Sequence, residues 1–264
     1  MRVSVFRAAA LVALAISLPM LVAAPAAGQT VDDLVARHIQ ARGGYEKLKA
    51  INTVRITRTV ATPFSSVQVV TFKKRPDLIR WEQTPKGQTT AIPRAINATG
   101  AWDLAQGKVI MRPDPIAIEG RETDGDFDGL LVDWKQKGHN VTFEGKGKVG
   151  TADVYKLKVT TKSGAVREVY LDATTCLESQ IVGRVRLPQV DPRTKEHRFN
   201  DTTLVFSDYR DVNGVKFPFA IDEERIGGPI TQSFATYTEK IEVNVPMDDS
   251  LFAPPAAPPA GADK

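Results

Sequence analysis

Three aspartates near the middle of the chain are the residues best placed to do chemistry: Asp124, Asp126 and Asp128, followed by Gly129. Their alternation, with a glycine in the sixth position, matches the first half of an EF-hand loop, in which carboxylate oxygens hold Ca²⁺. A complete loop needs a bidentate glutamate in its twelfth position, and Lys135 stands there. The run is therefore a weak calcium-like motif, and we expect no bound metal.

Other patterns that support catalysis or metal binding are missing from the sequence. The histidines His38, His139 and His197 and the cysteine Cys176 lack the short spacing of zinc ligands. No G-x-S-x-G motif occurs, and no serine or cysteine stands beside a suitable base. We therefore predict a protein that is not an enzyme and uses no cofactor. An enzyme acting on a hydrophobic substrate is the less favoured alternative.

The aspartates precede a pattern that is typical of a helix. Phe127, Leu130, Leu131 and Trp134 recur at i, i+3, i+4 and i+7, which places them on one face of a helix over residues 124–138. Acids suit the amino end of such a helix, and the glycine at the end of the run would end it. We interpret the acidic run as the cap of this central helix.

Two further helices are predicted near the N-terminus. Thr30 and the acids after it start the first one, with His38 as a packed residue on its apolar face. Gly43-Gly44 ends it, and a short second helix follows to Ile51. Residues 114–123, with their prolines, predict an irregular connection.

From Thr53 onward the sequence predicts strands, in alternating runs about ten residues apart. Asn213-Gly214, between two such runs, is typical of a hairpin turn. Cys176 is expected to be a buried or half-buried strand residue, and residues 189–200 a loop. We count about eleven to thirteen antiparallel strands. A twisted sheet of that many strands must curl, and the helices are the candidates to cover its concave face.

The N-terminus predicts export. Arg2 and Arg7 precede an apolar run from Ala8 to Leu21, and small residues follow, as in a signal peptide cleaved near Gly28. The apolar run is too short for a membrane span, and no cysteine follows it, so we expect a soluble periplasmic protein. Without the two arginines the formal charge falls from +4 to +2 (4 minus 2), with both signs interspersed. Such a surface argues against a nucleic-acid partner.

Three stretches resemble a known family: ARHIQARGGYEKLKAINTVR, DFDGLLVDWKQKGH and DYRDVNGVKFPF. They resemble the periplasmic lipoprotein-carrier superfamily (the LolA/LolB-like fold), most of all its outer-membrane lipoprotein-sorting-like members. The resemblance implies a half-open antiparallel β-barrel, closed by N-terminal helices and a central helix, around a hydrophobic cavity. It also implies a lipid or lipidated protein as partner, with a donor or acceptor protein in the inner or outer membrane.

Together with the N-terminal pattern and the Pro/Ala-rich composition of the C-terminus, this resemblance divides the chain into a signal peptide over residues 1–28, one lipid-binding domain over 29–252 and a disordered Pro/Ala-rich tail over 253–264. The predicted function is non-covalent carriage of a lipid, lipoprotein or other hydrophobic ligand, with the central helix as a lid. An envelope-stress regulatory module that contacts a membrane protein is the alternative.

Large apolar side chains are the candidate ligand-binding residues. Ordinary core packing is the competing interpretation for most of them. The candidates are Phe127, Leu130, Leu131 and Trp134 on the central helix, and Phe72, Trp81, Trp102, Phe206, Phe217 and Phe219 on strands.

Overall fold

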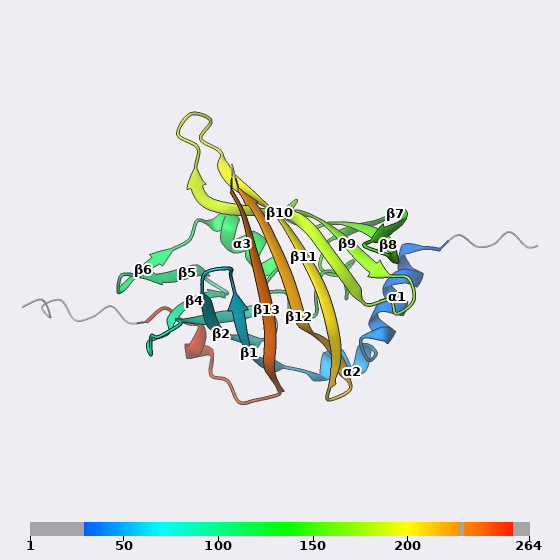
Figure 1. Ribbon diagram of the computed structural model, residues 1–264, viewed down its shortest axis with the longest axis horizontal. Coiled ribbons are helices and arrows are strands. Elements are labelled where there is room, and N and C mark those ends of the chain that lie inside the picture. Colours follow the sequence, from blue (N-terminus) through cyan, green and yellow to red (C-terminus); the bar gives the residue numbers. More distant parts are fainter. Residues whose placement is uncertain (1–28, 228–229, 256–264) are drawn as a thin grey trace, which may run out of the picture.

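The computed structural model describes residues 29–227 and 230–255 (Figure 1). The predicted signal peptide and residues 256–264 of the predicted tail lie outside the described residues. One antiparallel sheet of 13 strands forms the body of the fold, in the order β6-β5-β4-β3-β2-β1-β13-β12-β11-β10-β9-β8-β7. The mainly β prediction is confirmed.

The strands fall into two groups. The first group is β1 (Thr53–Ala61), β2 (Ser66–Lys74), β3 (Leu78–Pro85), β4 (Ile92–Asn97), β5 (Gly100–Ala105) and β6 (Lys108–Met111). The second is β7 (Asn140–Val149), β8 (Ala152–Thr160), β9 (Val166–Asp172), β10 (Glu178–Val190), β11 (His197–Val212), β12 (Val215–Gly227) and β13 (Ile230–Val243). Each group is a meander of neighbouring strands, and the pairing of β1 with β13 joins the two into one sheet.

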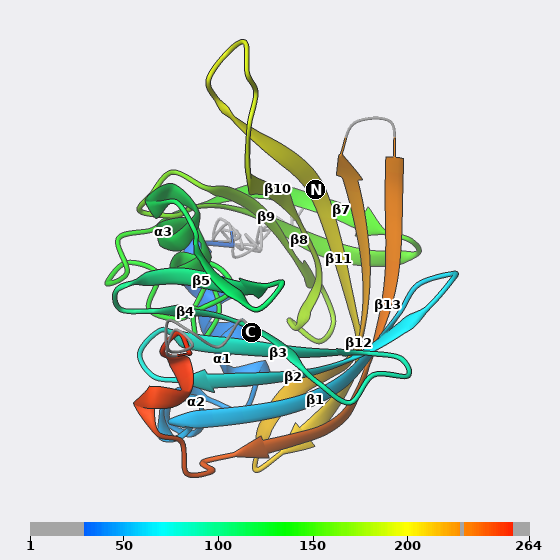
Figure 2. The ribbon, with the colours of Figure 1, turned by 90° about the vertical axis from the view of Figure 1, so that its left-hand side faces the viewer.

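The chain crosses from one edge of this sheet to the other in a single connection. After edge strand β6 it forms helix α3 (Asp114–Glu122) and an irregular segment, residues 123–139, and then enters the opposite edge strand β7. The sheet curls around these elements (Figure 2). Helix α3 contacts β4 and β5 on one side and β10 on the other, so it bridges the two halves of the curl.

Strand pairing assigns every side chain to one of two faces, because residues directly opposite each other in an antiparallel ladder point to the same side. We call inner the face that carries Ile56, Thr71 and Ile241, which are mutually opposite on β1, β2 and β13. The three α-helices and residues 123–139 pack on this face. The outer face carries the residues that alternate with these along each strand.

Three clusters of buried apolar side chains lie on the inner face. In the first, Leu34 and Val35 of helix α1 (Val31–Ala41) meet Leu130 and Leu131 over strands β7 to β9. The second joins helix α2 (Tyr45–Ala50) and Val132 to β1, β12 and β13. The third packs Ala117 of α3 on β3, β4 and β5. The core therefore lies between the sheet and the elements inside its curl.

The predicted N-terminal helices and the hairpin are confirmed. Thr30 and Asp33 form a capping box at the start of α1. Asn213 and Gly214 both have positive φ, as the two central residues of a type I′ turn require. Gly43, also at positive φ, packs against the backbone of Gly214 where a Cβ would collide. The turn thus fixes the N-terminal helices against β11 and β12.

The predicted central helix over residues 124–138 is wrong: the helix in this part of the chain is α3, and 123–139 is a run of turns. Asp133 takes a left-handed conformation in the middle of the predicted helix, and Gly129 does so near its start. The predicted irregular connection 114–123 is the part that is helical. Pro115 lies in the first turn of α3, where proline's missing N–H is not needed.

Two smaller predictions also need correction. Cys176 is buried as expected but lies in the turn between β9 and β10, at positive φ. The loop predicted over residues 189–200 is shorter, because β10 extends to Val190 and β11 begins at His197. Among the described residues, no helix is both long and apolar enough to cross a bilayer.

Candidate functional site

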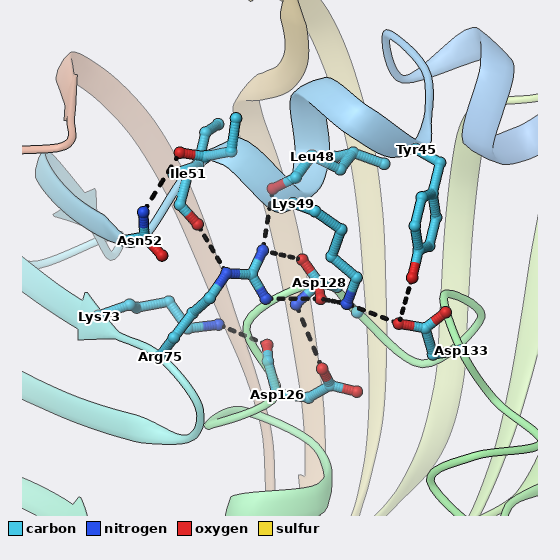
Figure 3. Close-up of polar contacts among 12 residues, drawn as sticks. Tyr45, Leu48, Lys49, Ile51, Asn52, Lys73, Arg75, Asp126, Asp128 and Asp133 are labelled. Atoms are coloured by element: carbon cyan, nitrogen blue, oxygen red, sulfur yellow. Dashed lines mark hydrogen bonds and ion pairs between the residues drawn. The ribbon is translucent and has the colours of Figure 1, made fainter.

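Asp128 is the centre of a buried polar network on the inner face (Figure 3). Its carboxylate accepts two hydrogen bonds from Arg75, at 2.7 and 2.6 Å, and one from Lys49 at 2.6 Å. Arg75 also donates to the carbonyls of Leu48 and Ile51, at the end of α2. Burial raises the pKa of Asp128, but the hydrogen bonds and charges of Arg75 and Lys49 outweigh it and hold the pKa at about 2. We call Asp128, Arg75 and Lys49 the Asp128 hub.

Two of the three calcium-like aspartates, Asp126 and Asp128, thus have cationic partners of their own. Asp126 forms an ion pair with Lys137 at 2.8 Å, and its backbone carbonyl accepts a hydrogen bond from Lys73. Across the described residues, no group of three or more His, Cys, Asp or Glu side chains could hold a metal ion. The acidic run anchors residues 123–139 to the sheet and to α2.

The predicted lid residues belong to the packed core. Leu130 and Leu131 are buried in the cluster around α1, and Trp134 packs partly against it. Phe127 packs partly against the second cluster, with the Arg75 guanidinium 4.4 Å above its ring. The segment therefore covers the sheet as a fixed part of the core.

The strand candidates divide between the two faces. Trp81, Phe206, Phe217 and Phe219 lie on the inner face, and the last two pack in the second cluster. Phe72 and Trp102 lie on the outer face, each one residue along its strand from an inner residue. The candidates therefore do not share one surface, because a shift of one position reverses the direction of a strand side chain.

On the outer face, Phe72 and Trp102 lie under the C-terminal segment, which ends in the short helix η1 (Asp249–Phe252). The indole of Trp102 donates to the Phe252 carbonyl at 3.0 Å, and Arg80 donates to the Leu251 carbonyl at 2.8 Å. A groove of about 950 Å³ remains between this segment and the strands, with Phe72 in its wall. The groove is a second candidate surface for an apolar ligand.

Part of the inner face belongs to none of the three core clusters. It lies on β1, β2 and β11 to β13, toward the strand ends away from α2. Its apolar side chains are only half-buried: Val60, Val67, Leu204, Phe206, Ile221 and Phe234. Four residues form one straight row across neighbouring strands: Val60, Thr236, Ile221 and Phe206. We call this surface the open inner face.

Cationic side chains border the open inner face. Arg58 on β1, Lys73 on β2 and Arg94 on β4 all point inward, by the register of their strands. Arg58 and Lys73 are half-buried and Arg94 is exposed. The surrounding protein nevertheless lowers the pKa of Arg58 to about 10, lowers that of Lys73 to about 8 and lowers that of Arg94, in each case chiefly by desolvation. Such groups line an interior that water reaches.

The sequence prediction did not include these cations as site residues. The alternation of β1 contains the signal: Val54 and Ile56 are buried, so Arg58 must point to the same side. His38, by contrast, is the packed residue that the sequence predicts, fully buried with Nδ1 3.0 Å from the Cys176 carbonyl oxygen.

The sequence matches no family model and no curated protein. Solved structures are similar to it at low identity. A LolA superfamily protein of Nitrosomonas europaea is 10% identical with a TM-score of 0.55, over 86% of this chain and 98% of that one. A domain of Vibrio parahaemolyticus assigned to outer membrane lipoprotein sorting is 12% identical with a TM-score of 0.51, over 84% and 95%. At these identities the likeness concerns the fold, and the chain has the LolA-like fold.

Proposed function

We propose that this protein binds a lipid, lipoprotein or other hydrophobic molecule without covalent chemistry and carries it through the periplasm, with residues 29–252 as the binding domain. The observation that carries the proposal is the open inner face, where half-buried apolar side chains lie inside the curl of the sheet and outside every core cluster. The similar structures, a LolA superfamily protein and a lipoprotein-sorting domain, point the same way.

The energetics support a ligand on this surface. Complete burial of one large apolar side chain yields about 1.5–3 kcal/mol relative to exposure. The row from Val60 to Phe206 is only half-buried in the free protein, so an apolar ligand would gain part of that free energy at each position. Such a gain needs no displacement of the core.

A helical lid is not part of this proposal. Residues 123–139 are held by Leu130 and Leu131 in the core and by the Asp128 hub. An acyl chain competing for the same contacts would have to break the hub as well. We propose that the ligand binds beside this segment, on the open inner face.

Ligand binding by the delipidated protein tests the proposal. We expect saturable binding of a fluorescent fatty acid, and native mass spectrometry of protein from its own periplasm should detect a bound lipid. Phe206→Gln should weaken the binding several-fold. Its matched control is Val205→Gln, because Val205 is the next residue on β11 and points to the outer face.

Two results would overturn the proposal. One is the absence of any saturable binding together with the absence of co-purifying lipid. The other is unchanged binding in Phe206→Gln with loss of binding in Phe72→Gln, which would place the ligand in the outer groove.

We also propose that residues 1–28 direct export and are removed. The intact mass of protein from the native host, compared with the mass of the full chain, tests this step. A carrier of this kind needs a donor and an acceptor at the membranes, which cross-linking in whole cells would identify.

A further inference from the structure

The cations of the inner face form one group across four neighbouring strands. Thr71, Trp81 and Arg94 stand directly opposite one another on β2, β3 and β4, so this row spans about 10 Å at the usual strand spacing. Lys73 lies two residues from Thr71 on the same face, and Arg58 lies on the adjacent strand β1. Arg58 stands opposite Val69 and Lys73 opposite Val54, so each lies two positions from the Thr71 row, one on either side of it.

These cations have no carboxylate partner within the described part of the chain. Arg58 donates to the Thr238 hydroxyl at 3.3 Å, and Lys73 donates to a backbone carbonyl. Arg94 stacks 4.6 Å above the Trp81 ring. The cations of the Asp128 hub differ, because Arg75 and Lys49 both pair with Asp128.

The carboxylates near the group do not neutralise it. Asp126 and Glu223 are paired with Lys137 and Arg225. Asp103, directly opposite Arg94 on β5, forms an ion pair with Arg112. The negative charge of Asp124 raises the pKa of Lys73 and that of Arg94, but desolvation by burial is the larger effect and lowers both. One free acid faces three cations here among the described residues, so the group keeps an excess of positive charge.

Thr71 adds an independent sign of a missing partner. Its side chain is 3% exposed, and its hydroxyl has no hydrogen-bond partner among the described residues. A buried hydroxyl normally finds a partner, and an unpaired one needs an explanation such as an absent ligand. The hydroxyl lies on the face and in the row of the cations, so it can donate to an anion held by them.

This cationic group adjoins the apolar row. The row from Val60 to Phe206 begins two residues along β1 from Arg58. A ligand with one charged end and one apolar end therefore fits the two surfaces together. Charge-assisted hydrogen bonds to arginine and lysine are the usual means of holding a carboxylate or a phosphate.

We propose that Arg58, Lys73, Arg94 and the Thr71 hydroxyl bind the anionic head, a carboxylate or a phosphate, of an acyl ligand whose chain lies on the open inner face. This inference rests on the proposed function and names the substrate class: an anionic amphiphile. Trp81 supports the Arg94 guanidinium with its ring and packs on the third core cluster.

Titration calorimetry with matched ligands tests the proposal. The ligands are oleate, oleoyl lysophosphatidate, uncharged oleyl alcohol and inorganic phosphate. We expect the delipidated protein to bind at least one of the two anionic lipids about tenfold or more tightly than the alcohol, as one charge-assisted contact provides. The lipid that binds more tightly shows whether the head is a carboxylate or a phosphate.

Arg58→Gln and Arg94→Gln should each remove most of this preference and leave the affinity for oleyl alcohol nearly unchanged. The control is Arg55→Gln, on the outer face of the same strand, which should keep the preference. Because an unpaired cation does not stabilise the free protein, the melting temperature of Arg94→Gln should stay the same or rise. Lys73→Gln gives a second variant if one of the arginine variants fails to fold.

Three results would overturn the inference. The first is equal affinity of the wild-type protein for oleate, lysophosphatidate and the alcohol, which leaves the proposed function intact. The second is a preference that survives in all three inner-face variants. The third is inorganic phosphate binding as tightly as lysophosphatidate, which would mean a site for a free anion. If none of the acyl ligands binds and no lipid co-purifies with the native protein, the proposed function fails with it.

Discussion

Two regions of the same inner face accommodate desolvated charge in opposite ways. Around the Asp128 hub, Arg75 and Lys49 share a carboxylate that is 4% exposed on its side chain, and the apolar residues beside it are tightly packed. Around the open inner face, Arg58, Lys73 and Arg94 face half-buried apolar residues and have no carboxylate partner among the described residues. The cations of the first region are neutralised within the protein, whereas those of the second region have no counter-charge unless an anion binds.

This contrast separates stability from function within one sheet. A buried cation without a counter-charge is disfavoured by desolvation, and folded proteins usually pair it. The hub follows this rule and fixes the crossover connection in place. The cationic group departs from it, as functional sites commonly do. Three changes test whether the two regions differ in this way.

The largest effect is expected for Leu130→Ser combined with Leu131→Ser. Both side chains are buried in the first core cluster, and one large-to-small change in a core costs about 2–5 kcal/mol. Because domains are stable by only about 5–15 kcal/mol, we expect the double variant to lose cooperative unfolding in urea. Ile110→Ser with Met111→Ser, at exposed positions of β6, is the control and should still unfold cooperatively. A folded double variant with altered lipid binding would instead restore the lid hypothesis.

A smaller effect is expected for Asp128→Asn. The change leaves Arg75 without its carboxylate, while Lys49 keeps its ion pair with Asp133, and breaking a buried pair costs about 3–5 kcal/mol. We expect the lower end, because both cations keep some contact with water. Chemical denaturation at neutral pH measures the loss, and Asp153→Asn, in an exposed pair with Lys148, should show no measurable change. Equal stabilities of the two variants would show that the hub is no more than a surface ion pair.

The smallest effect concerns pH. Desolvation lowers the pKa of Lys73 to about 8, below its ordinary value of about 10.4. Between these values the unfolded chain binds the proton and the folded chain does not, so this residue's contribution to stability rises with pH. Lys73→Met removes the contribution. We therefore expect the variant's advantage over the wild type in urea midpoint to be larger at about pH 7.5 than at about pH 9.5. An advantage that does not change with pH would mean that Lys73 is not desolvated.

The strands could be predicted from the sequence because period-two alternation and turn residues are local signals. Asn213-Gly214 and the Thr30 cap were sufficient to place a hairpin and a helix start. The central helix could not be predicted correctly, because its apolar spacing has a different cause. Leu131 and Val132 are neighbours that enter two different core clusters, which a single helical face does not allow.

The site was harder to predict than the fold. The choice of Phe72 and Trp102 followed from residue type, but the face of a strand residue depends on its register with neighbours that are distant in sequence. Arg58 and Lys73 become notable only when the pairing shows that they lie on the same side as Ile56 and Thr71. Whether a cation has a carboxylate partner depends on the three-dimensional arrangement of the chain, which the sequence alone does not show.

The pairing of β1 with β13 has a consequence for how the molecule folds. Val54 pairs with Val243, so the ladder that unites the two meanders joins positions near the two ends of the described chain. Contacts of such long sequence separation form slowly, because closing a long loop loses entropy before it gains contacts. Each meander can form from local hairpins, but the seam must wait until the last strand has emerged. A chain arrested before β13 would leave two unpaired strand edges, which makes it prone to aggregation.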